Sequence, residues 1–146
     1  MADSNLFERV GGYLVLRRVH ELFYEKVFEH PWLGRFFVDQ SREHLANQQT
    51  DFMAQVMGGP RRYFGRLPRA AHEHIYITDR VFDLRSELLA EALRESGVEE
   101  ELAKEWLEKD GHFRKGLTKA SISECKKRFT TDVIVAPLRP DERRSA

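Results

Sequence analysis

The stretch MGGPRRYFGRLPRAAH, residues 57–72, decides how this chain folds. Gly58-Gly59 ends the helix expected before it, and the proline, glycine and arginine residues between Pro60 and Pro68 cannot continue that helix. We therefore expect an irregular loop that delivers His72 at the start of the next short element, facing whatever the preceding helix faces. A neutral imidazole held in this way can be a ligand to a metal or to a haem iron.

Apolar residues at helical spacing on both sides of this stretch predict an all-α chain. A second doublet, Gly11-Gly12, separates a short helix from a longer one, Ser41 is the expected N-cap of the helix before the loop, and Gly97 is the expected stop between the last two helices. The expected helices cover residues 6–10, 13–29, 32–38, 42–57, 79–96 and 98–117. We expect one domain over residues 1–118 and a C-terminal extension over residues 119–146 that is partly helical and then flexible.

Composition narrows the class of protein. The 146 residues suffice for one domain with a real core, and 24 acidic residues balance 24 basic ones, so net charge gives no argument for a nucleic-acid or membrane partner. No apolar run approaches the roughly 18 residues that span a bilayer, and the first residues lack the order of a signal peptide. Cys125 is the only cysteine, which excludes an internal disulfide and favours a reducing, cytoplasmic location.

Polar side chains lie on helix faces that should be dry. Gln49 is in the middle of the apolar stripe of the helix before the loop, Gln48 borders that stripe, and Tyr24 flanks the stripe of the preceding helix. A buried amide or phenol without a partner costs roughly 1–3 kcal/mol. Gln49 and Tyr24 therefore either bond each other or backbone carbonyls, or they form the polar corner of an apolar ligand pocket.

Two charged residues occupy matching places on the last two helices. Arg85 is in the centre of one apolar stripe and Asp110 in the centre of the other, at similar distances before and after Gly97. Antiparallel helices joined there would bring them together, so we predict a buried ion pair that fixes helix register. The alternative is that Arg85 reaches a bound anion or a cofactor carboxylate.

His74 is the rival of His72 as a ligand. Residues two apart on a helix point about 200° away from each other, so only one of the two would face a pocket. The sequence has no HExxH motif, paired cysteines, GxSxG motif or phosphate-binding loop. The arginines between residues 61 and 69 are most simply a solvated loop, with phosphate or propionate contact as the alternative.

Taken together, these residues resemble the truncated haemoglobins, the short two-over-two globins, and most of all their first group. The resemblance covers about residues 5–118. It is carried by segments in the family's order and nearly at its spacing: LFERVGG (6–12), LFYEKV (22–27), RFF (35–37), Phe52 with VMGG (56–59), YFGR (63–66), Ala71-His72 and Phe82. It implies a truncated two-over-two helical sandwich around haem.

The resemblance also implies roles for particular residues. His72 corresponds to the proximal iron ligand, Phe37 to a phenylalanine packed on the haem face, and Tyr24 to the tyrosine that donates a hydrogen bond to the bound gas. Gln49 would assist Tyr24, and the residues expected to bind the cofactor are His72, Phe36, Phe37, Leu45, Gln48, Phe52, Tyr63 and Arg69. Gln48 replaces the distal histidine that binds the iron in some relatives, so an open or weakly water-ligated site is expected.

Three functional hypotheses follow. The first is a haem b protein that binds O2, NO and CO and converts NO to nitrate with the help of an unidentified reductase. Peroxide chemistry or electron transfer with the same residues is the alternative within this hypothesis. The second is a gas or redox sensor, or interaction module, that acts through the C-terminal extension. The third is a helical domain without haem, in which Tyr24, Gln49 and the Arg85–Asp110 pair are purely structural.

Overall fold

The computed structural model describes residues 4–141, which are helical with two isolated β-bridges and no β-strand in that range. The expected all-α class is confirmed. The elements are α1 (Leu6–Val10), α2 (Tyr13–Glu29), the 3-10 helix η1 (Leu33–Phe37), α3 (Arg42–Val56), α4 (Pro68–Ala71), α5 (Asp79–Glu95), α6 (Glu100–Gly111), α7 (Arg114–Leu117) and the 3-10 helix η2 (Ile122–Glu124). No helix within residues 4–141 is long and apolar enough to cross a membrane.

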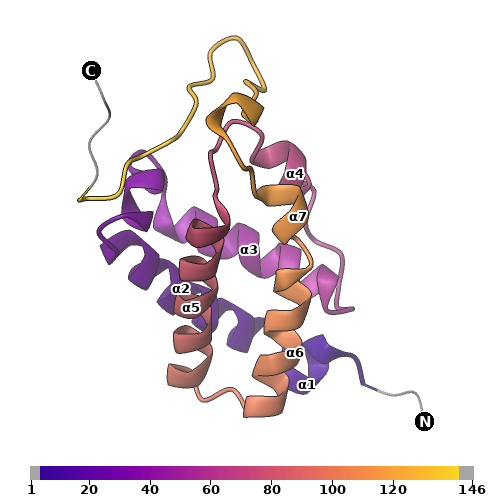
Figure 1. Cartoon of the computed structure of the whole chain (residues 1–146). Helices are drawn as coiled ribbons and strands as arrows, with labels where there is room; N and C mark the ends of the chain where they lie inside the picture. Colours follow the sequence, from indigo (N-terminus) through magenta and orange to yellow (C-terminus); the bar gives the residue numbers. More distant parts are fainter. Residues whose placement is uncertain (1–3, 142–146) are drawn as a thin grey trace.

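The long helices form two layers (Figure 1). α2 packs along α3 in one layer, α5 and α6 form an antiparallel pair in the other, and α2 also contacts α5. The short helix α1 lies against α6, and α4 lies against α7. Two pairs of helices therefore face each other, which is the two-over-two arrangement that the resemblance implied.

Local capping explains where the helices begin and end. The Ser41 hydroxyl accepts a hydrogen bond from the backbone of His44, and the Thr78 hydroxyl accepts one from Val81, as expected of N-cap residues. Gly97 follows α5 with a φ of +77°, a conformation that a residue with a Cβ rarely adopts. The predicted starts of α3 and α5 and the stop at Gly97 are confirmed.

The glycine doublet Gly58-Gly59 is also the place where α1 packs against the end of α3. The backbone N–H of Phe7 donates to the Met57 carbonyl at 3.2 Å, and the Asn5 side chain donates to the Gly58 carbonyl at 2.8 Å. A Cβ on Gly59 would lie 2.5 Å from the Phe7 ring. Gly59 is therefore required because α1 approaches the end of α3 so closely.

The core lies where the two layers meet. Its largest fully buried side chains come from both layers and are Trp106, Phe23, Phe82, Leu16, Met53, Leu89, Leu93, His20 and Val19. Burying a large apolar side chain stabilises the fold by about 1.5–3 kcal/mol. The residues of this core belong to α2, α3, α5 and α6, so these four helices hold the scaffold on which the shorter elements are placed.

One predicted helix is broken in the structure. Residues 98–117 were expected to form a single helix, but α6 ends at Gly111 and α7 begins at Arg114 after a turn at His112 and Phe113. Glycine is a poor helix former, and the turn brings Phe113 against Phe52 of α3, with ring centroids 5.2 Å apart. The break therefore directs an aromatic side chain between the layers.

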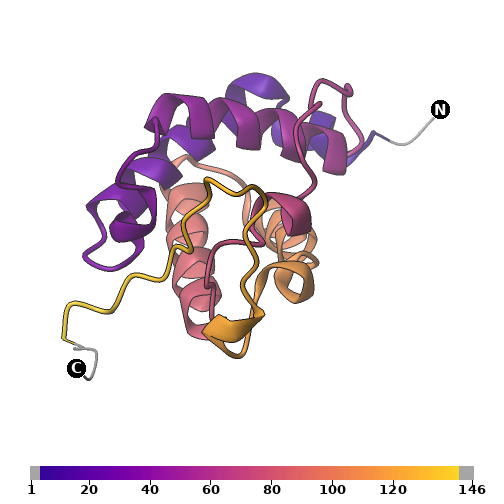
Figure 2. The same cartoon turned by 90° about the horizontal axis from the view of Figure 1, so that it is seen from above.

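The chain beyond α7 returns across the molecule (Figure 2). After η2, the backbone N–H of Lys126 donates to Glu73, and the N–H of Val135 donates to His74, each at 2.9 Å. The Trp32 indole then donates to the Pro137 carbonyl at 3.0 Å. The extension therefore contacts both the segment after α4 and the start of η1.

Candidate functional site

A cavity of about 450 Å³ lies between the two helical layers. Helices α2 and α3, with η1, supply one part of its wall, and the segment from α4 to the start of α5 supplies another. Its apolar lining consists of Phe23, Val27, Leu33, Phe36, Phe37, Leu45, Phe52, Pro68, Ala71, Ile75, Ile77, Val81, Phe82, Phe113, Leu117 and Val135. A volume of this size with a mostly apolar wall is typical of a small-molecule or cofactor site.

His72 is fixed at the end of α4 rather than at its start. Leu67 is extended before Pro68, which occupies the first turn of α4, and His72 is the C-cap residue. The His72 Nδ1 lies 2.7 Å from the Pro68 carbonyl oxygen. Because a carbonyl can only accept, Nδ1 carries the proton and Nε2 keeps its lone pair.

The surroundings of His72 keep its ring neutral. Burial lowers the pKa of His72 to about 4, against the raising effect of the hydrogen bond to Pro68, and the charges of Arg85 and Lys119 lower it further. A neutral imidazole that donates one N–H to a carbonyl is the usual state of a metal-ligating histidine, since the carbonyl fixes the tautomer and the ring orientation. His72 therefore has the chemistry of a single nitrogen ligand at the cavity.

His74 lines the same cavity, which corrects the expectation that only one of the two histidines could face it. That expectation assumed a helix, but α4 ends at Ala71 and the chain turns at residues 72–74. The His74 Nδ1 is buried and has no hydrogen-bond partner among residues 4–141. His74 thus lacks the carbonyl contact that orients His72, and we keep His72 as the predicted ligand.

Tyr24 places a phenol at the cavity from α2. Its side chain is buried, and its ring lies edge-on to Phe23 and Phe37 at 4.9 and 6.2 Å. Burial raises the pKa of Tyr24 to about 12, with opposing effects from Arg85 and Asp110. The hydroxyl therefore keeps its proton at neutral pH and can donate a hydrogen bond.

The two glutamines of α3 also line the cavity, Gln49 partly buried and Gln48 exposed. Within residues 4–141, the side chains of Tyr24, Gln48 and Gln49 make no hydrogen bond. The interpretation that Gln49 and Tyr24 bond each other or backbone carbonyls is therefore wrong. Their polar atoms are free to meet a ligand in the cavity.

Arg85 and Asp110 form the predicted pair. The guanidinium donates from Nη1 and Nη2 to the two carboxylate oxygens at 2.5 and 2.9 Å, with side-chain exposures of 24% for Arg85 and 4% for Asp110. Arg85 nevertheless lines the cavity, with its guanidinium 5.4 Å from the ring centres of Phe23 and Phe82. The predicted ion pair is confirmed, and Arg85 also lines the cavity; its contact with a bound anion or a cofactor carboxylate stays a prediction.

Aromatic rings from several segments form or support the cavity wall. Phe37 stacks on Phe28 at 5.5 Å with an interplanar angle of 23°. The Phe52 ring lies 5.2 Å from both Tyr63 and Phe113, and the Tyr63 hydroxyl donates to the Arg66 carbonyl. The aromatic residues predicted for the cofactor, Phe36 among them, are thus brought together.

The cationic residues of the cavity differ from those predicted. Arg69 was expected to bind the cofactor, but it is exposed on α4 and does not line the cavity. Arg66 and Arg128 line it instead. The sequence of an irregular loop does not show which of its arginines points into a cavity. In the C-terminal extension, no periodicity in the sequence indicated that Arg128 or Val135 would line it.

The residues present fit a haem. A haem is a flat, largely apolar ring whose iron takes a nitrogen ligand from the protein. The cavity offers apolar and aromatic walls, one oriented imidazole at His72, and unpaired donors at Tyr24 and Gln49. The helical layers and this cavity together define a haem-pocket protein of the two-over-two globin type.

Comparison with known proteins agrees with this class. The family model described as bacterial-like globin matches residues 5–119. The group 1 truncated hemoglobin of Tetrahymena thermophila is 34% identical over 113 residues, which cover 77% of this chain and 93% of the relative. The group 1 truncated hemoglobin GlbN of Mycolicibacterium paratuberculosis is 34% identical over 104 residues, 71% of this chain and 76% of the relative.

A solved structure extends the likeness to three dimensions. The crystal structure of truncated hemoglobin from Tetrahymena pyriformis in its Fe(III) form matches with a TM-score of 0.74 and 32% identity, covering 80% of this chain and 100% of that one. The chain belongs to the truncated haemoglobins, and it is most similar to their first group. Membership of this family implies that it binds haem and gas ligands such as O2.

Proposed function

We propose that the chain is a haem b protein in which His72 is the proximal ligand, and that it uses bound O2 to oxidise NO to nitrate. The observation that carries this proposal is the group of unpaired donors, Tyr24 and Gln49, in a cavity that is otherwise mostly apolar and also holds an oriented imidazole. When bound, the haem supplies a ferrous iron with one position open to a diatomic gas.

The residues of the chain would act on the ligand in distinct ways. His72 offers Nε2 while its Nδ1–H is held by the Pro68 carbonyl. Tyr24 and Gln49 would donate hydrogen bonds to the partial negative charge of bound oxygen, and bonds to charged acceptors are roughly twice as strong as neutral ones. The phenylalanine wall would keep water from competing for those donors.

The proposed reaction balances with one outside partner. One O2 and one NO combine to nitrate, and this leaves the cofactor short of one electron, which a reductase must return. CO would bind in place of O2 without reacting. We place this chemistry in the cytoplasm, where a reductase and a reduced Cys125 are both expected.

Spectra of single variants test the iron ligand. We expect the ferrous chain reconstituted with haem to give a five-coordinate spectrum, His72→Ala to lose it, and His74→Ala to keep it, since only His72 has its Nδ1 fixed by a carbonyl. The measurement is the visible spectrum of the ferric, ferrous and CO-bound forms. Loss in the His74 variant alone would reverse the assignment.

Rapid mixing tests the reaction. We expect the O2-loaded chain to yield about one nitrate per NO, and Tyr24→Phe to release O2 at least ten times faster, because one charge-assisted hydrogen bond is worth roughly 1.5–3 kcal/mol. Leu45→Ile is a matched control, since it changes the wall without removing a donor. Slow decay of the O2-loaded spectrum on mixing with NO would remove this role from the protein.

A sensor is the second candidate, and one observation favours it. The extension bonds directly to the backbone of the segment that follows His72, through Lys126 to Glu73 and through Val135 to His74. Movement of that segment on ligation would reach the extension. The test is limited proteolysis of residues 119–141 in the unligated and CO-bound forms, and identical cleavage rates would count against sensing.

A further inference from the structure

The chain carries a segment beyond the shared family domain that returns to the cofactor cavity. The family model ends at residue 119, and we call residues 126–138 the strap. The strap is bonded to the segment after α4 at one end, and at the other its Leu138 carbonyl accepts from Arg35 at 2.9 Å. Figure 2 shows it crossing from the side of α4 and α7 toward the N-terminal elements.

Arg128 is the strap residue that brings a charge to the cavity. Its Nε and Nη2 donate to the two oxygens of Asp132 at 2.9 and 3.1 Å, and its Nη1 donates to the Ala71 carbonyl at 3.2 Å. These bonds lock the guanidinium next to His72. A guanidinium has five N–H groups, so one on each terminal nitrogen remains for another acceptor.

A second cation stands beside it. The Arg66 guanidinium lies 4.7 Å from the centre of the Phe129 ring, and the Arg128 guanidinium lies 5.6 Å from the same centre. Both arginines line the cavity, and no carboxylate within residues 4–141 pairs with Arg66. Asp132 offsets the charge of Arg128 alone, so the Arg66 guanidinium would gain most from an anion bound in the cavity.

We infer that Arg128 and Arg66 together bind a carboxylate of the cofactor, so that the strap is part of the cofactor site. Carboxylates are the acceptors that arginine recognises with two parallel hydrogen bonds. The inference rests on the proposal that the cofactor is haem b, whose ring carries two propionate carboxylates. Val135 adds an apolar contact to the same cavity from the same segment.

The rate of haem loss tests this inference without using any catalytic activity. The ferric protein is loaded either with protohaem or with its dimethyl ester, in which both carboxylates are blocked, and transfer to excess apomyoglobin is followed by absorbance. We expect Arg128→Gln to speed the loss of protohaem about tenfold and to leave the loss of the ester unchanged. Lys127→Gln, an exposed neighbour, should change neither rate.

Two further variants keep the test decisive. Arg66→Gln, which breaks no ion pair, should also speed the loss of protohaem and leave the loss of the ester unchanged. Arg128→Lys keeps the positive charge, so it should lose protohaem more slowly than Arg128→Gln does. Equal acceleration with both cofactors would mean that Arg128 only positions the strap, and unchanged rates would mean that it does nothing; either result overturns the inference. Failure to take up either cofactor would overturn the proposed function as well.

Discussion

At the scale of single residues, a buried histidine joins three helices. His20 of α2 is 1% exposed, its Nδ1 lies 2.9 Å from the Thr50 hydroxyl of α3, and its ring meets Trp106 of α6 edge-on at 5.6 Å. Burial, and to a smaller extent the charge of Arg85, lowers the pKa of His20 to about 3, although Asp110 raises it. The folded chain therefore holds this imidazole neutral.

This pKa predicts a loss of stability in mild acid. The unfolded chain takes up a proton at His20 near pH 6.5, whereas the folded chain resists it down to about pH 3, so the free energy of unfolding falls as the pH drops through that window. From pH 7 to pH 5 this one group should cost about 2 kcal/mol. Urea titrations of the wild type and of His20→Gln should show it as a steeper loss in the wild type. If the free energy of unfolding fell equally with pH in both proteins, the prediction that His20 causes the loss would be contradicted.

The sequence was informative about residues whose neighbours are set by helical geometry. Arg85 and Asp110 could be paired in advance because both lie on regular helices with a known turn between them. His74 could not be placed, because the helical rule does not apply after α4 ends. Arg69, which does not line the cavity, could not be placed either, because the irregular loop and the single turn of α4 leave side-chain directions to tertiary contacts.

At the scale of elements, α6 makes two ion pairs with other helices within residues 4–141, and these differ chiefly in burial. Arg85–Asp110 and Arg9–Glu105 both join two nitrogens to two oxygens, with all four distances between 2.5 and 2.9 Å. The side chains of Arg9 and Glu105 are each 41% exposed, whereas that of Asp110 is 4% exposed. Water competes for the outer pair and hardly reaches the inner carboxylate, so the two pairs should stabilise the fold unequally.

The inner pair should therefore be the more costly one to break. We expect Asp110→Asn to lower the free energy of unfolding by about 2–4 kcal/mol, since it leaves the Arg85 charge unpaired in a half-buried place. The matched change Glu105→Gln should cost less than about 1 kcal/mol. Chemical denaturation of both variants gives the comparison, and equal costs would show that burial does not separate the two pairs.

The sequence predicted which helices exist better than it predicted where each of them ends. The starts of α1, α2 and α3 follow from caps and glycines that act locally, and they lie where the sequence placed them. The break between α6 and α7 was missed because Leu102, Trp106, Phe113 and Leu117 keep a helical spacing across it. Its cause is the packing of Phe113 on Phe52, a contact between residues far apart in sequence.

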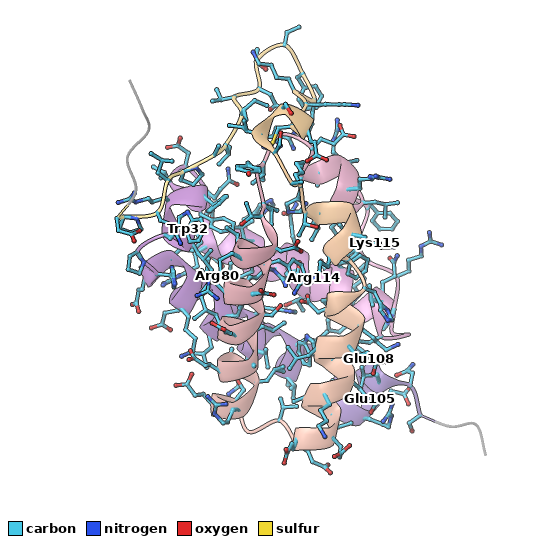
Figure 3. The ribbon with its side chains drawn as sticks, in the orientation of Figure 1. Trp32, Arg80, Glu105, Glu108, Arg114 and Lys115 are labelled. Carbon is cyan, nitrogen blue, oxygen red and sulfur yellow. The ribbon has the colours of Figure 1, made fainter. Side chains whose placement is uncertain are left out.

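At the scale of the whole molecule, a net charge of zero conceals one acidic and one basic segment of the chain. Residues 87–108 hold eight glutamates against Arg94 and Lys104, whereas residues 60–72 hold four arginines and no acidic residue. Glu105 and Glu108 lie on α6 toward the α5–α6 turn, and Lys115 lies nearer the extension (Figure 3). Arg66 of the basic segment and Arg128 of the C-terminal extension both line the cavity.

This separation of charge predicts electrostatic steering of small anions. The rate constant for azide binding to the ferric haem-loaded chain should fall as ionic strength rises from about 0.01 to about 0.1 M, where the Debye length shrinks from about 30 to 10 Å. Arg66→Glu at the cavity should weaken this dependence of the binding rate on salt, whereas Lys104→Glu on α6 should preserve it. A rate constant for azide binding that is independent of salt in the wild type would mean that the charged segments do not steer anions to the cavity.

The strap also gives the two termini different uses in the laboratory. One end of the strap bonds to the backbone at His74, and at its other end the carbonyl groups of Pro137 and Leu138 accept hydrogen bonds from Trp32 and Arg35. The helix α1 lies far from the strap, against α6. A mechanical load or a bulky fusion attached after Asp141 would pull on the wall of the haem pocket. A surface tether or fluorescent label is therefore better placed at the N-terminal end. One placed after Asp141 would transmit force to the wall of the haem pocket.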